Sequence, residues 1–172
     1  MSRLILIWFD ICLLRVGPQD LPASRELLGL TMASYALVSF LLSLPGYPSV
    51  AAGQLALMDA TLLVVFAATV LYLSGRMARL TQTLTALSGT GTLLGLIALP
   101  VMQLLSSGRE AGQPFLLAGM LWLLLFGWNL LVMAHIMRHA LSVKFPVAIG
   151  IAMLYTLVAM QIINALFPMS QV

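Results

Sequence analysis

The sequence predicts an all-α, polytopic integral membrane protein: a bundle of five transmembrane helices preceded by one short N-terminal helix. Of its 172 residues, 62% are hydrophobic and 8% are charged, whereas about 25% are charged in an average soluble domain. The charged residues also lie in clusters that are separated by long uncharged stretches. Each charge-free stretch exceeds the roughly 20 residues that cross a bilayer; these stretches are residues 27–58, 80–108, 111–137 and 145–172.

The chain opens with a short apolar segment, Leu4 to Leu14, which only Asp10 interrupts. Eleven helical residues reach about 16 Å, too short to span a membrane. We expect an interfacial or bundle-capping helix, with Arg3 and Arg15 in the headgroup region. Because Asp10 breaks the apolar run and no small-residue cleavage site follows closely, we do not expect a signal peptide.

Prolines punctuate the predicted spans. Pro18 and Pro22 bracket a turn, after which Ser24 or Asp20 can cap the next helix. Pro100 should kink the third span, because it removes one backbone hydrogen bond and crowds the preceding turn. We expect a single integral membrane domain, residues 1–172, with spans at about 27–44, 54–74, 84–105, 115–137 and 146–167.

The positions of lysine and arginine predict the orientation, because short loops rich in these residues stay cytoplasmic. Seven of the eight fall on one side of a five-span arrangement, and only Arg109 falls on the other. This distribution places the N-terminus in the cytoplasm and the C-terminus on the other side of the membrane. The short loops and compact size favour a bacterial inner membrane, so we expect the C-terminus to be periplasmic. The seven are Arg3, Arg15, Arg25, Arg76, Arg79, Arg138 and Lys144.

Asp59 is the only carboxylate within a predicted span, about one turn from the outer end of the second. A charge at the bilayer centre costs roughly 2.5–3.5 kcal/mol on insertion scales. Two roles are open: a polar outer vestibule or ion path, or an interhelical hydrogen-bond cluster in which Asp59 reaches headgroups or Arg109. The polar residues expected near the same outer ends are Gln103, Gln161 and Asn164.

Asn129, at mid-depth of the fourth span, needs a partner on another helix or contacts a substrate. Trp122 and Trp128 lie deeper than the usual aromatic belt, so we expect them to pack between helices or against lipid tails. Gly91 and Gly95 form a small-xxx-small pattern that lets two helices approach closely.

His135 and His139 share one helix face, a spacing that can hold a metal ion. Without a third ligand nearby they are weak candidates, and the commoner role is that of interfacial histidines facing anionic headgroups. Cys12 is unpaired and is expected to pack as a small apolar residue.

The sequence carries no paired carboxylates, activated nucleophile or zinc motif, so we expect no enzymatic activity and no cofactor. The cations are explained by topology, so the net charge of +3 does not indicate nucleic-acid binding.

The five-span layout of residues 25–168 resembles the Yip (Ypt-interacting protein) family of membrane proteins, bacterial type. The likeness is best in the last two spans, where Leu121-Trp122 and Trp128-Asn129 lead to Arg138 and Lys144. Eukaryotic members carry Asp-Leu-Tyr-Gly-Pro before the first span, whereas this chain reads Gly-Pro-Gln-Asp-Leu-Pro at 17–22. The resemblance implies a non-enzymatic protein that works through partners.

Two functions therefore remain open. The first is a structural or interaction subunit, held in the lipid bilayer and docked onto another membrane protein or onto itself. The alternative is a small transporter or channel subunit that uses a polar outer vestibule around Asp59. The few intramembrane polar residues, and the lack of a pair of broken helices, favour the first.

Overall fold

A computed structural model of the chain describes residues 2–110 and 116–167. Within these ranges all the regular secondary structure is helical, and five helices are long and apolar enough to cross a membrane. The predicted fold class, an all-α membrane bundle with a short N-terminal helix, is confirmed. The elements are α1 (Ser2–Cys12), the 3-10 turn η1 (Pro18–Asp20), α2 (Arg25–Ser43), α3 (Ser49–Leu73), the 3-10 turn η2 (Met77–Arg79), α4 (Leu80–Glu110), α5 (Leu116–Leu141) and α6 (Phe145–Leu166).

Two helices extend well beyond the predicted spans. α3 begins at Ser49 rather than near residue 54, because residues 49–53 are small or apolar and Pro48 supplies a proline just before the first turn. α4 runs without interruption through Pro100 to Glu110. Its 31 residues reach about 46 Å, which exceeds a hydrocarbon core of about 30 Å, so α4 must tilt or project beyond the core.

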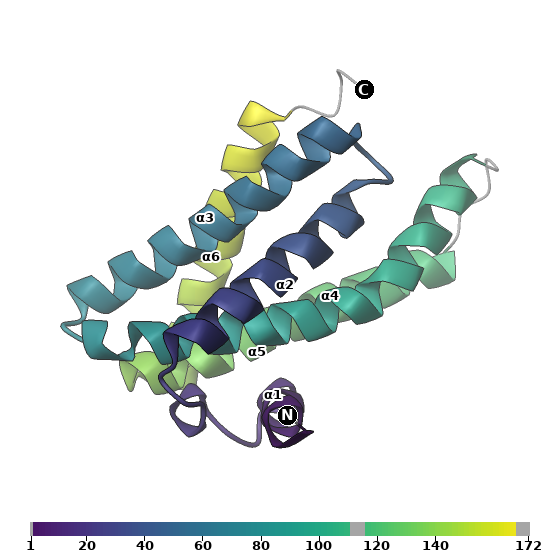
Figure 1. The fold of residues 1–172 in the computed structure, drawn as a ribbon. Coiled ribbons are helices and arrows are strands. Elements are labelled where there is room, and N and C mark those ends of the chain that lie inside the picture. The colour runs from purple at the N-terminus through teal and green to yellow at the C-terminus, as the bar shows by residue number, and fades with distance from the viewer. Residues whose placement is uncertain (1, 111–115, 168–172) are drawn as a thin grey trace.

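α4 is the central helix. It packs against α1, α2, α3 and α5, and it is the most buried of the five long helices. α2 pairs with α3, and α5 pairs with α6. In Figure 1, α4 and α5 run side by side from the lower left, α3 lies on the other side of α2, and α6 rises from the lower left end of α5 behind α3.

The two ends of the bundle differ in charge. At one end Arg79 Nη1 donates to the carbonyl oxygens of His139 and Ala140, both at 3.0 Å. Gln82 Nε2 donates to the Leu21 carbonyl at 2.8 Å, which brings the start of α2 to the same end. We call this the basic end, because it carries Arg25, Arg76, Arg79, Arg138 and Lys144.

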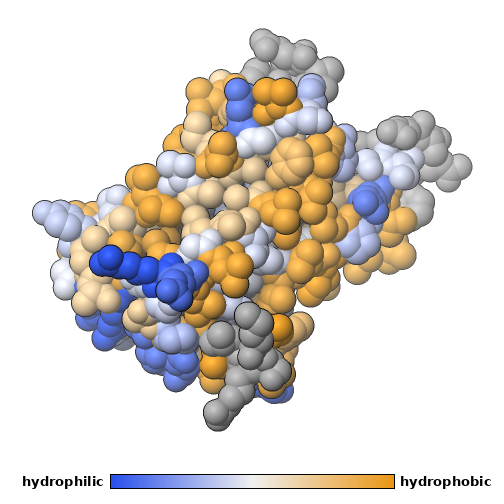
Figure 2. All heavy atoms as spheres, in the orientation of Figure 1, coloured by the Kyte–Doolittle hydropathy of each residue, from blue (hydrophilic) through white to orange (hydrophobic). Residues whose placement is uncertain are grey.

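At the opposite end, which we call the far end, the Tyr47 hydroxyl donates to the carbonyl oxygen of Phe167 at 3.2 Å. The α2–α3 connection therefore lies beside the last turn of α6. Figure 2 shows apolar residues over most of the visible face, while hydrophilic residues gather at the lower left, where the basic end lies in Figure 1.

Glycines set the close approach of α2 to α4. A Cβ atom at Gly91 would lie 2.7 Å from the Tyr35 ring, and one at Gly95 would lie 2.5 Å from a methyl carbon of Val38. Both contacts are shorter than packed carbon atoms allow, so a side chain at either position would force the helices apart.

α1 packs against the flank of the bundle. Its Trp8 ring lies on Gly89 of α4, and the Trp128 indole of α5 donates to the carbonyl oxygen of Cys12 at 3.0 Å. Gly89 lies nine residues from the start of α4, about 13 Å along that helix. α1 therefore contacts α4 well inside its length and does not cover the end of the bundle.

The segment between α1 and α2 shows which of the two expected caps forms. Ser24 Oγ accepts from the Leu27 amide at 3.2 Å and caps α2. Asp20 Oδ2 instead accepts from the Gly17 amide at 3.0 Å, which closes the 3-10 turn that Pro18 begins.

Candidate functional site

Asp59 of α3 is held by two hydroxyl groups of α2. Tyr35 Oη donates to Asp59 Oδ2 at 2.7 Å, and Ser39 Oγ donates to the same oxygen at 3.0 Å. Tyr35 and Ser39 are four residues apart, so they lie on one face of α2. Among the hydrogen bonds within the described residues, none reaches Asp59 Oδ1.

Asp59 lies deeper in the bundle than the sequence predicted. The expected position was one turn from the outer end of its helix, but α3 begins ten residues earlier, at Ser49. Asp59 is thus about 15 Å along the helix. Tyr35 in α2, Asn129 in α5 and Tyr155 in α6 are also near mid-length of their helices.

Three adjoining cavities share Asp59 as a lining residue. The first has a volume of about 360 Å³ and is bounded by all five long helices. The second, of about 210 Å³, lies between α2, α4 and α5 beside Asp59. The polar side chains of the first cavity are Tyr35, Asp59, Thr90, Asn129, Tyr155, Thr156 and Asn164.

The third cavity, of about 570 Å³, extends from Asp59 to the far end. The α2–α3 connection lines it at Pro45, Gly46 and Tyr47, and the distal part of α4 lines it at Ser106. The carboxylate therefore lies at the base of a hollow that reaches the loops of the far end.

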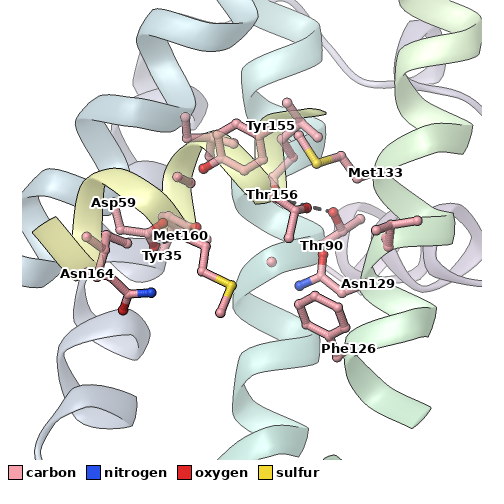
Figure 3. A pocket seen from close by; sticks show the side chains of 16 residues that line it. Tyr35, Asp59, Thr90, Phe126, Asn129, Met133, Tyr155, Thr156, Met160 and Asn164 are labelled. Carbon is pink, nitrogen blue, oxygen red and sulfur yellow. Dashed lines mark hydrogen bonds between the residues drawn. The ribbon is translucent and has the colours of Figure 1, made fainter. Parts of the chain in front are cut away.

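Tyr155 contributes a hydroxyl group that has no hydrogen-bond partner within the described part of the chain, although it is buried. Its ring is held by Phe66 of α3, with ring centroids 4.8 Å apart. Figure 3 shows the Tyr155 hydroxyl directed toward the side of the cavity where Asp59 lies. An unsatisfied buried hydroxyl calls for a partner, and a molecule in this cavity could supply one.

The charge of Asp59 has no basic partner in the described structure. Among residues 5–108 and 116–167, no Lys, Arg or His lines any of the three cavities. The expected contact with the Arg109 side chain lies outside the described residues. Two hydroxyl donors can stabilise a carboxylate, but they leave its net charge in place.

The predicted polar residues divide into two groups. Asn129 and Asn164 line the first cavity with Asp59. Gln103 and Gln161 are exposed and line none of the three cavities. On α6 the cavity is lined by residues 155, 156, 159, 160, 163 and 164, and Gln161 lies off this helix face. The bonds from Tyr35 and Ser39 place Asp59 in an interhelical hydrogen-bond cluster, one of its two expected roles, through two partners that were not among the predicted residues.

His135 and His139, the weak candidates for metal ligands, make hydrogen bonds to Val16 and Arg138. His135 Nε2 lies 2.9 Å from the Val16 carbonyl oxygen, and Arg138 Nε donates to His139 Nε2 at 3.3 Å. The two rings meet edge to face, with centroids 4.7 Å apart. Within the described residues, no three His, Cys, Asp or Glu side chains come together as a metal site.

The tryptophans and the cysteine occupy distinct places. Trp122 lines the second and third cavities, whereas Trp128 holds α1 through its bond to Cys12. The Cys12 side chain is buried, and this burial raises the pKa of its thiol to about 11. Such a thiol is a poor nucleophile near neutral pH.

The fold and cavity define an integral membrane protein with a polar pocket at mid-helix level. No protein-family model, curated protein or solved structure matches the chain.

Proposed function

We propose that the protein binds a cation at Asp59 and moves it across the membrane, as a small transporter or transport subunit. One observation carries this proposal. A carboxylate at mid-length of the bundle lines three cavities, one of which reaches the far end, and no described basic side chain neutralises it. An ionisable residue inside a membrane bundle is a typical marker of an ion or proton path.

The energetics favour a bound cation or proton over a bare charge. An unpaired carboxylate at the bilayer centre costs roughly 2.5–3.5 kcal/mol even on the mildest scales. The hydrogen bonds from Tyr35 and Ser39 fix its orientation. The remaining cost is removed when a proton or another cation enters from the cavity.

The structure is open toward the far end and closed toward the basic end. Beyond the cavity, the basic end is filled by a fully buried apolar core that includes Leu71, Ile136 and Met137. Small residues of α6, Ala148 and Ala152, complete the seal. A cation that passes through must wait for this core to separate, so the arrangement suits a gated transporter better than an open pore.

The test is flux in liposomes that contain the purified protein. With imposed gradients of H⁺, Na⁺, K⁺ or an alkylammonium ion, each followed by its own internal dye or tracer, we expect flux of at least one cation that Asp59→Asn abolishes and Asp59→Glu partly retains. Gln161→Leu is the matched control, because Gln161 is a polar residue of α6 outside the cavities. Flux that is unchanged in a folded Asp59→Asn protein would overturn the proposal, as would its absence from the wild type.

The orientation of the bundle in the membrane is part of the same proposal. We place the basic end in the cytoplasm and the far end in the periplasm of a bacterial inner membrane, since lysine and arginine stay on the cytoplasmic side. Reporter fusions after Tyr47, Arg79, Gly112, Arg138 and Val172 should alternate, beginning outside. A cytoplasmic C-terminus would contradict the arrangement.

A role as a structural or interaction subunit, which the Yip-like resemblance implies, stays a prediction. The exposed apolar faces of α5 and α6 suit lipid tails as well as a neighbouring helix. Recovery of a stoichiometric membrane partner in mild detergent, together with a lack of flux, would favour that role over transport.

A further inference from the structure

We propose that the first cavity takes an organic cation, a primary ammonium group attached to a compact apolar body. This inference rests on the proposed function, and it names the class of substrate. It follows from the volume of the cavity, the side chains around Asp59 and the unsatisfied hydroxyl of Tyr155.

The cavity has room for more than an inorganic ion. Its volume of about 360 Å³ falls in the range of about 300–1,000 Å³ that is usual for small-molecule sites. The apolar body of a ligand would occupy the space beside eight apolar lining residues, because the seven polar ones are spread over all five long helices. The site has the common form of an apolar pocket with a small set of orienting polar groups.

The apolar walls are of the kind that attracts organic cations. Tyr35, Phe126 and Tyr155 present three aromatic rings, and Met133 and Met160 add two thioethers. Aromatic faces attract cations through the ring quadrupole, and methionine adapts to irregular apolar shapes. Figure 3 shows Met160 and Phe126 beside Asn129, across the pocket from Tyr155.

The donor set fits an ammonium group better than a metal ion. Calcium takes six to eight oxygen ligands, and magnesium needs near-ideal octahedral geometry. Here one carboxylate oxygen already accepts from two hydroxyl groups, and no cluster of acidic side chains occurs in the described residues. An ammonium group has three donors, which could reach Asp59 Oδ1, the Tyr155 hydroxyl oxygen and the Asn129 carbonyl oxygen.

Calorimetry would measure the binding of 2-phenylethylammonium to the purified wild-type protein in lipid nanodiscs. The neutral 2-phenylethanol is the matched ligand, since it keeps the ring and chain and loses the charge. We expect the ammonium to bind at least about tenfold more tightly, because a hydrogen bond to a charged group is worth about 1.5–3 kcal/mol.

Variants separate charge from packing. Asp59→Asn should remove the preference for the ammonium, and Tyr155→Phe should weaken ammonium binding about fivefold, the effect of losing one ordinary hydrogen bond. Gln161→Leu should change neither the preference for the ammonium over the alcohol nor the affinity for the ammonium. Circular dichroism of each variant establishes that the helices are intact, and Asp59→Glu, which keeps the charge, should retain part of the preference.

The outcomes distinguish this inference from the proposed function. Equal binding of the alcohol and the ammonium would overturn the inference. So would an Asp59-dependent flux of H⁺ or K⁺ that saturating 2-phenylethylammonium leaves unchanged, although transport itself would then stand. Asp59-dependent ammonium binding without flux of any cation would support the inference and contradict transport.

Discussion

Replacing Gly91 by alanine should disturb the Asp59 site without altering any polar group. The new Cβ would lie 2.7 Å from one carbon of the Tyr35 ring and 2.9 Å from another. Ordinary contact between carbons begins near 3.4 Å, so the ring must move by about 0.7 Å or α2 must shift away from α4. Either movement stretches the 2.7 Å hydrogen bond from Tyr35 to Asp59.

The expected cost combines two opposing effects. Overpacking a tight contact costs about 1–3 kcal/mol, while replacing a helical glycine by alanine returns up to about 1 kcal/mol. We expect Gly91→Ala to be destabilised by about 1–2 kcal/mol. Gly127→Ala is the matched control: Gly127 is also within a long helix, but no atom lies within 4 Å of its added Cβ, so this protein should be as stable as the wild type or more stable.

The assay is reversible unfolding in mixed micelles, followed by far-ultraviolet circular dichroism, in a double-mutant cycle with Tyr35→Phe. Tyr35→Phe alone should cost about 0.6–1.7 kcal/mol, the range for interhelical hydrogen bonds in membranes. In the Gly91→Ala background the same change should cost less, because the bond is already stretched and weakened. Equal stability of the Gly91→Ala and Gly127→Ala proteins, with an unchanged cost of Tyr35→Phe, would show that Gly91 does not position Tyr35 against Asp59.

Three further predictions concern the N-terminal segment and the basic end. Maleimide should modify Cys12 slowly at pH 7.5, and the rate should rise about tenfold per pH unit toward pH 11, because only the thiolate reacts; a rate that levels off near pH 9 would show an unshifted pKa. Trp128→Phe should speed this modification by removing the indole donor that holds the Cys12 carbonyl, whereas Trp122→Phe, which alters a cavity wall, should not. Arg79→Gln should accelerate hydrogen exchange at the Val143 amide, because the carbonyls of His139 and Ala140 lose their shared donor; Lys144→Gln serves as the control, and equal exchange in the two variants would contradict this role for Arg79.

Much of the fold could be predicted from the sequence, because a bilayer restricts a chain to few solutions. Four uncharged stretches longer than the hydrocarbon core predicted four of the five helices, and the apolar run around Asp59 predicted the other. The turn at Pro18 and Pro22 marked the boundary before the first span. α3 begins five residues before the predicted span, because Ser49 to Gly53 lack the strong apolarity that marks a span but remain compatible with a helix. The docking of α1 on α4 and α5 depends on contacts of Trp8 and Trp128, which no local pattern reveals.

The candidate site was only partly visible. Asp59 stood out as a carboxylate within an apolar stretch, and Asn129 as an amide at mid-depth. Tyr35 and Ser39 were missed because hydroxyl residues are common in spans, although their spacing of four residues was an available signal. Tyr155 gave no local sign, since its role depends on α6 bringing it to the same cavity as Asp59.

Thiol chemistry can measure whether the hollow at Asp59 is open to the far side and negatively charged. Ser39→Cys, in a Cys12→Ser background, places a thiol beside Asp59 and in the wall of the third cavity. The protein would be treated from the far side with methanethiosulfonates that carry either a trimethylammonium or a sulfonate group, with each rate normalised to that of a free thiol.

We expect the cationic reagent to react faster than the anionic one, and we expect the addition of Asp59→Asn to remove this preference while the thiol stays reactive. A thiol that reacts only after denaturation in SDS would contradict a cation path at Asp59, because the hollow would then be closed. A preference that survives Asp59→Asn would contradict it equally, because Asp59 would not be the charge that attracts the cation.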